Sequence, residues 1–88
     1  MILKIFKSPT CGSCRMFAPQ IESAVKETGI TTQVYDVFSD EGLEEAKKYG
    51  VTHSGVAVLI DENSGNTLFT WQNPTKSDEL VKTIKQFL

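Results

Sequence analysis

The segment Ser8-Pro9-Thr10-Cys11-Gly12-Ser13-Cys14-Arg15-Met16-Phe17-Ala18-Pro19 holds both cysteines of the 88-residue chain. Ahead of it, Ile2 to Phe6 is a short apolar run, typical of a buried strand that stops at a Lys-Ser-Pro loop. From Cys14 onward, apolar residues recur at three- and four-residue spacing until Gly29, which predicts an amphipathic helix with a glycine stop. Pro19 inside this helix predicts a kink. The cysteines therefore lie where a strand passes into a helix.

The elements after this segment decide the fold class. The predicted strands are Ile2–Phe6, Thr31–Phe38, Val56–Ile60 and Thr67–Trp71, and the predicted helices run from Cys14 to Gly29, from Ser39 or Asp40 to Gly50, and from a Thr75-Lys76-Ser77-Asp78 capping box to Leu88. The order strand, helix, strand, helix, strand, strand, helix predicts an α/β fold. We expect a mixed sheet of about four strands, with a parallel first crossover, an antiparallel last pair and helices on both faces.

Composition indicates one small globular domain over residues 1–88, with 23% charged and 40% apolar residues. The net charge of −2 provides no basic stripe for nucleic acid, and no apolar run approaches the ~18 residues of a membrane span. The start of the chain lacks the pattern of a secretion signal, so we expect a cytoplasmic protein. Trp71 and the stripe Leu80, Ile84 and Phe87 are predicted core, and the acidic residues Asp36, Asp40, Glu41, Glu44 and Glu45 are predicted to form a solvated face.

Placement of the cysteines points to redox chemistry. A thiolate at a helix N-terminus is stabilised by unpaired backbone N–H groups and by the positive end of the helix dipole. Cys11 is therefore expected to be the nucleophile. Cys14, one turn further in, is close enough to attack a disulfide formed at Cys11 and is expected to be the more buried, resolving cysteine.

Other roles for a Cys-x-x-Cys pair remain open at this point. A purely structural disulfide would close a very short loop and would seldom persist in a reducing compartment. Zinc needs four ligands, and one chain supplies only two cysteines and His53 besides carboxylates. A dimer could assemble four thiolates around zinc or an iron–sulfur cluster. A partner-binding domain that has lost turnover is a further alternative.

Residues 8–19 resemble the active-site segment of thioredoxins and small glutaredoxin-like redoxins, including the proline five residues after the second cysteine. Tyr49-Gly50-Val51 and the closing hairpin and helix also resemble this family, so the resemblance covers essentially the whole chain. It implies a thioredoxin-like three-layer sandwich of glutaredoxin size and a protein disulfide oxidoreductase that requires no bound cofactor or metal. In this family the proline kinks the active-site helix, which accounts for Pro19.

Three departures from the family pattern concern the surroundings of the cysteines. Gly55 stands where family members carry a cis-proline, and a non-proline cis bond is costly, so the loop is expected to be trans. Ile5 and Thr10 replace the buried aspartate and the tryptophan of thioredoxins. The Thr-Val-Pro segment and acidic pair with which glutaredoxins hold glutathione are absent. The sequence therefore favours a dithiol redoxin acting on protein disulfides over a glutathione-dependent enzyme.

The resemblance also implies site residues and partners. Substrate contacts are expected at Thr10, Gly12, Ser13, Ser54, Gly55 and Val56. His53, Lys7 and Arg15 are candidate modulators of the Cys11 thiolate, with a solvent-exposed loop histidine and ordinary surface charges as the alternatives. The implied partners are protein disulfides, with a ribonucleotide reductase as one client, and a thioredoxin-reductase-type flavoenzyme as electron donor. The chain is expected to be a monomer.

Overall fold

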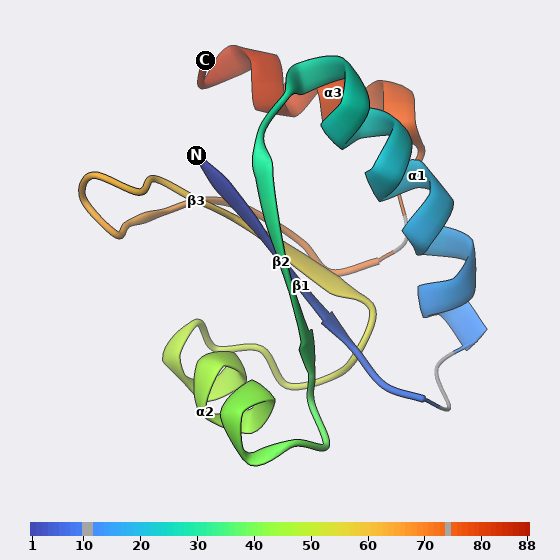
Figure 1. Ribbon diagram of the computed structural model, residues 1–88, viewed down its shortest axis with the longest axis vertical. Helices are drawn as coiled ribbons and strands as arrows, with labels where there is room; N and C mark the ends of the chain where they lie inside the picture. The colour runs from blue at the N-terminus through green and yellow to red at the C-terminus, as the bar shows by residue number, and fades with distance from the viewer. Residues whose placement is uncertain (10–11, 74) are drawn as a thin grey trace.

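Four strands form a mixed sheet in the order β2-β1-β3-β4 in the computed structural model, which describes residues 1–9, 12–73 and 75–88 (Figure 1). The strands are β1 (Ile2–Lys7), β2 (Thr31–Asp36), β3 (Val56–Ile60) and β4 (Thr67–Trp71). β1 is parallel to β2 and antiparallel to β3, and β3 is antiparallel to β4. The predicted mixed sheet and its antiparallel last pair are confirmed.

Within the described ranges, three helices cover the two faces of the sheet, namely α1 (Gly12–Thr28), α2 (Asp40–Lys48) and α3 (Ser77–Gln86). α1 and α3 pack together on one face, and α2 lies on the other (Figure 1). Side chains alternate between the two faces of the sheet along β1. Leu3 therefore belongs to the core beneath α1 and α3, whereas Phe6 belongs to the core beneath α2. The fold is therefore the expected three-layer α/β sandwich. No helix within the described ranges is long and apolar enough to cross a bilayer.

The end of β2 and the start of α2 are joined by a tight turn. β2 ends at Asp36, two residues before the predicted Phe38, because the Phe38 N–H bonds Asp36 Oδ1 at 2.9 Å and the Ser39 N–H bonds the Asp36 carbonyl at 3.0 Å. Ser39 then caps α2, as predicted, by accepting from the Gly42 N–H at 3.0 Å. A Cβ at Gly42 would collide with the Asp36 carbonyl, so glycine allows α2 to begin this close to the strand.

The predicted capping box before α3 is wrong. Lys76 is the N-cap residue and makes no side-chain cap, and the Thr75 hydroxyl donates to the Asn73 carbonyl instead. The Ser77 N–H, at the start of the helix, donates to Gln20 Oε1 of α1 at 2.8 Å. A side chain of the neighbouring helix therefore caps α3.

The predicted apolar stripe of α3 is confirmed only in part. Leu80 and Ile84 are fully buried in the core beneath α1 and α3, and Trp71 on β4 is 6% exposed in the same core. Phe87 was also expected there, but it follows the end of the helix at Gln86 and is 41% exposed. That expectation is wrong because the helix ends one residue before Phe87.

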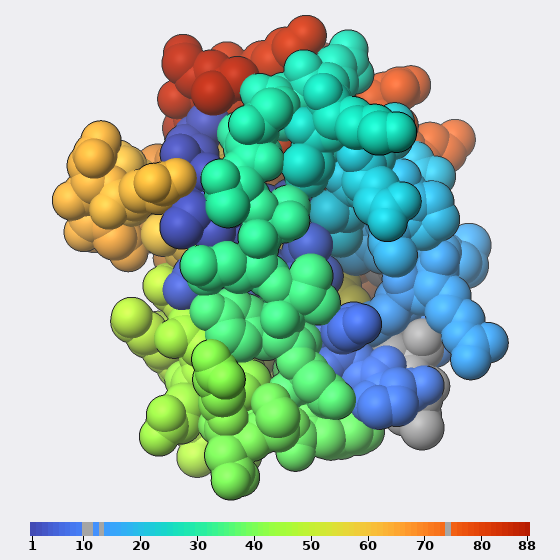
Figure 2. Space-filling view, in the orientation of Figure 1, coloured from blue at the N-terminus to red at the C-terminus, as the bar shows by residue number. Residues whose placement is uncertain are grey.

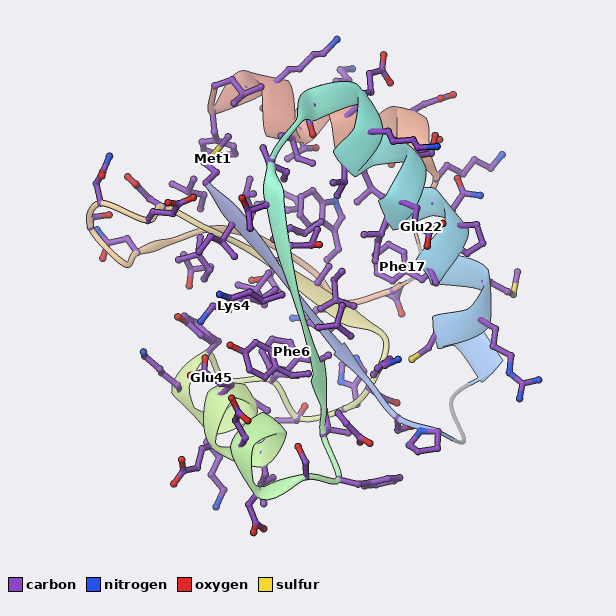
Figure 3. All side chains as sticks on the ribbon, in the orientation of Figure 1. Met1, Lys4, Phe6, Phe17, Glu22 and Glu45 are labelled. Carbon is purple, nitrogen blue, oxygen red and sulfur yellow. The ribbon has the colours of Figure 1, made fainter. Side chains whose placement is uncertain are left out.

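Glu45 does not belong to the predicted solvated face. Lys4, in the middle of β1, is buried, and its Nζ donates to Glu45 Oε2 at 2.9 Å (Figure 3). The same Nζ lies 4.9 Å from the centre of the Tyr49 ring and 5.6 Å from that of Tyr35. Burial lowers the pKa of Lys4, but hydrogen bonds and charge interactions with Glu45 and Tyr49 outweigh it, so the pKa is raised above its ordinary value. This pair ties α2 to the sheet.

Removing the two partners of this pair is expected to have unequal effects. Glu45→Ala should lower the free energy of unfolding by about 2 kcal/mol, because it leaves an enclosed ammonium group without its carboxylate. Lys4→Met keeps the apolar stem and leaves a carboxylate that reaches water, so its cost should stay below about 1 kcal/mol. Denaturant unfolding at pH 7 measures both, and equal losses would contradict this reading.

The same pair predicts a pH dependence. Because the folded-state pKa of Lys4 is raised, its contribution to stability is complete below the usual lysine value of about 10.4 and is lost as the pH rises through the folded-state pKa. The stability difference between the wild type and Lys4→Met should therefore stay constant from pH 7 to about pH 10 and shift toward the variant above that pH. A difference that does not change above pH 10 would exclude the linkage.

Candidate functional site

The carboxyl end of β1 and the first turn of α1 form the centre of the candidate site. Thr10 and Cys11 lie outside the described residues, as does the side chain of Ser13. α1 begins at Gly12 and continues through Pro19 to Thr28, and the kink expected at Pro19 stays a prediction. Cys14 lies in the first turn of α1, where no acidic side chain opposes the positive end of the helix dipole.

Cys14 is half-buried and disulfide-bonded. It lines an open groove of about 840 Å³ between α1 and the sheet, together with Lys7 at the end of β1 and Gly55. The Cys14 half of the disulfide therefore faces the groove from the first turn of α1.

The loop before β3 is attached to the end of β1 beside this groove. The Gly55 N–H donates to the Phe6 carbonyl at 2.8 Å, and the Ser8 hydroxyl donates to Ser54 Oγ at 3.3 Å. Gly55 has a φ of +81°, and no described peptide bond is cis. A proline has no N–H to donate and holds φ near −65°, so glycine at position 55 fits a backbone that the family's proline could not adopt. The expected trans loop is present.

The predicted substrate-contact residues are brought together only in part. Gly55 is buried at the groove, and Ser54 is half-buried next to Ser8. Val56 is 2% exposed and packs in the core beneath α2, so its side chain lies within the protein. Gly12 is exposed at the start of α1.

The three candidate modulators lie in different places. Lys7 lines the groove, and Arg15 is exposed on the first turn of α1. The ring of His53 is exposed, and its Nε2 lies 3.1 Å from the Gln72 carbonyl, to which it can only donate. His53 lines a separate small pocket of about 150 Å³ next to the end of β4 and is not among the described residues that line the groove. The described contacts of His53 therefore connect the loop before β3 to β4 rather than to Cys14.

The described ranges contain no group of three or more His, Cys, Asp or Glu side chains that could hold a metal ion. The groove was not predicted from the sequence. Val34 lines it and is 54% exposed, but in the sequence an apolar residue at this position looks like an ordinary buried strand residue.

Comparison with known proteins identifies the family. The thioredoxin family model matches residues 1–86. Thioredoxin of Bacillus subtilis is 39% identical over 62 residues, which cover 70% of this chain and 60% of that protein. A probable thioredoxin of Archaeoglobus fulgidus is 37% identical over 60 residues, covering 68% of this chain and 64% of that protein. The aligned part of the chain thus spans less than two thirds of the length of these two curated relatives.

A solved structure agrees at the level of the fold. Thioredoxin 1 of Thermosipho africanus superposes with a TM-score of 0.82, covering 99% of this chain and 93% of that one at 21% identity. The family match extends over nearly the whole sequence and agrees with the observed strand and helix order. The chain belongs to the thioredoxin family.

Proposed function

We propose that the chain is a dithiol–disulfide oxidoreductase that reduces protein disulfides, with Cys11 as nucleophile and Cys14 as resolving cysteine. The observation that carries this proposal is the disulfide-bonded Cys14 in the first turn of α1, in a chain of the thioredoxin family. Family membership supports the same activity.

The proposed reaction has two exchange steps. The Cys11 thiolate attacks one sulfur of the substrate disulfide, and the other substrate sulfur leaves as a thiolate that takes up a proton. The Cys14 thiolate then attacks Cys11 in the mixed disulfide and releases the second substrate sulfur, which is also protonated. Two electrons and two protons pass to the substrate, and the chain is left with a Cys11–Cys14 disulfide. Backbone N–H groups at the start of α1 favour the thiolate form on which the first step depends.

Substrate would be held around the cysteines by Thr10, Gly12, Ser13, Ser54, Gly55 and Val56. The buried Val56 side chain leaves only the backbone of that residue for such contact. Lys7 lines the groove with Cys14 and is the best placed of the described cations to favour a thiolate there. Arg15 and His53 would act at longer range, because neither lines that groove among the described residues.

The proposed partners follow from family membership. They are protein disulfides, with a ribonucleotide reductase as a possible client, and a thioredoxin-reductase-type flavoenzyme that restores the dithiol. The chain would work in the cytoplasm as a monomer without a bound cofactor, and neither nucleic acid nor a membrane is a proposed partner.

Reduction of insulin disulfides by the purified chain tests the proposal. Dithiothreitol, or NADPH with a thioredoxin reductase, serves as electron donor, and iron and zinc are measured in the same sample. Turnover well above the rate of the donor alone, without stoichiometric metal, is the expected result. Absence of turnover together with stoichiometric metal in a dimer would instead establish the metal-binding alternative.

A further inference from the structure

The face of β2 that points toward the α1 and α3 layer is left partly uncovered. Val34 is paired with Ile5, and Thr32 with Leu3, so both β2 side chains share the face of the sheet that α1 covers. Leu3 is fully buried there, but Val34 is 54% exposed because the helix does not extend over the edge strand. On the opposite face, Tyr35 stacks on Phe6 at 5.6 Å beneath α2. The opening is therefore confined to one side of β2.

This opening is the groove that reaches Cys14. Its floor is formed by Ile5, Thr32 and Val34, and its wall by Phe17, Ile21 and Val25 of α1. Figure 2 shows it as the hollow between the green surface of β2 and the light-blue surface of α1, and in Figure 3 Phe17 points from α1 toward the sheet. Its volume of about 840 Å³ lies in the range of ligand-binding clefts, and apolar side chains provide most of the lining.

β2 is also the end strand of the sheet in the part of the chain that the structure describes. Asp36 is its only charged residue, and it contains neither lysine nor proline, which commonly block the edge of a sheet. An extended peptide can lie along such an edge and place alternate side chains on one face. In this chain, the face of β2 that carries Thr32 and Val34 forms part of the floor of the groove.

We propose that this groove, with Val34 on its floor, binds an extended apolar segment that flanks the disulfide of the protein substrate. The inference rests on the proposed function, because continuity with Cys14 identifies the occupant. A protein whose disulfide reacts at this cysteine pair brings its neighbouring residues to the same groove. Of the predicted substrate-contact residues, only Gly55 lines the groove among those described. Docking therefore extends away from the loop before β3 and along β2.

Substitution of Val34 tests the proposal through substrate discrimination. Val34→Glu places a carboxylate in the groove and should raise KM for insulin about tenfold, leaving kcat near the wild-type value. Reduction of hydroxyethyl disulfide, which has no flanking segment, should stay within about twofold of the wild type. Gln33→Glu is the matched control, because Gln33 is exposed on the opposite face of β2 and its Oε1 acceptor for the Tyr35 hydroxyl is kept. An equal loss with both disulfides, or an unchanged KM for insulin, would overturn the proposal.

A binding measurement separates this inference from the proposed function. The insulin B chain with its cysteines S-methylated cannot react, but it should shift the backbone amide resonances of Thr32 and Val34 in the wild type and not in Val34→Glu. Absence of these shifts would overturn the groove proposal even if insulin is reduced, whereas shifts without turnover would overturn only the proposed function. Sedimentation of the wild type as a dimer that Val34→Glu dissociates would show a second copy to be the occupant and would also overturn it.

Discussion

Cys14→Ser, with NADPH and a thioredoxin reductase as electron donor, is expected to lower steady-state reduction of insulin by at least about a hundredfold and to accumulate a covalent complex between the chain and its substrate. Cys11 can still attack the substrate disulfide, but the serine hydroxyl cannot resolve the mixed disulfide that forms. Non-reducing electrophoresis and intact-mass measurement should detect a one-to-one complex, which dithiothreitol releases. Because Cys14 is only half-buried, the substitution should leave the fold intact.

Cys11→Ser is the control for this experiment. It should lose turnover equally but form no complex, because the attacking sulfur is gone. A Cys14→Ser chain that reduces insulin at the wild-type rate would show that the second cysteine is dispensable, and a complex formed by Cys11→Ser but not by Cys14→Ser would reverse the assigned roles.

Gly55→Pro is expected to destabilise the fold by about 3 kcal/mol or more, although it introduces the residue that this family carries at that position. The substitution removes the N–H that donates to the Phe6 carbonyl at 2.8 Å, and it is incompatible with a φ of +81°. Since each kcal/mol lowers Tm by roughly 4–8 °C in a domain of this size, thermal unfolding should shift down by more than about 10 °C.

Gly55→Ala separates the two causes. Alanine keeps the N–H but must adopt the left-handed backbone, which costs about 1–2 kcal/mol. Its Tm should therefore fall between those of the wild type and Gly55→Pro. A proline variant as stable as the wild type would mean that the loop adopts a different backbone without cost and that the glycine conformation is not required.

Local patterns in the sequence predicted most of the fold. Every strand and helix was placed because alternating or helical apolar spacing and turn residues act over short distances, as with Ser39 at the start of α2. Contacts between distant residues were not predictable in this way. Gln20 caps α3 from 57 positions away, and Glu45 meets Lys4 across 41 positions. Such pairings depend on how the layers pack. The only indication of the Lys4–Glu45 pair in the sequence was a lysine inside an otherwise apolar strand.

The candidate site was likewise predictable only where a local pattern marks it. The position of Cys14 in the first turn of a helix could be predicted from the strand before it and the helical spacing after it. The groove could not, because Val34 is apolar and β-branched like any core strand residue, and its exposure depends on how far α1 reaches across the sheet. His53 was a candidate modulator of Cys11, with a solvent-exposed loop histidine as the alternative, and its exposed ring bonds the Gln72 carbonyl, a partner that no local pattern indicates.

A single-turnover measurement tests the central claim most directly. The chain, reduced and freed of dithiothreitol, is mixed with one equivalent of insulin, and the intact masses of both products are recorded after acid quenching. The account predicts that the chain loses two hydrogens and becomes a Cys11–Cys14 disulfide, while the insulin gains the same two hydrogens. A chain that keeps both thiols in the presence of the intact insulin disulfide would contradict the assignment of this site to disulfide reduction.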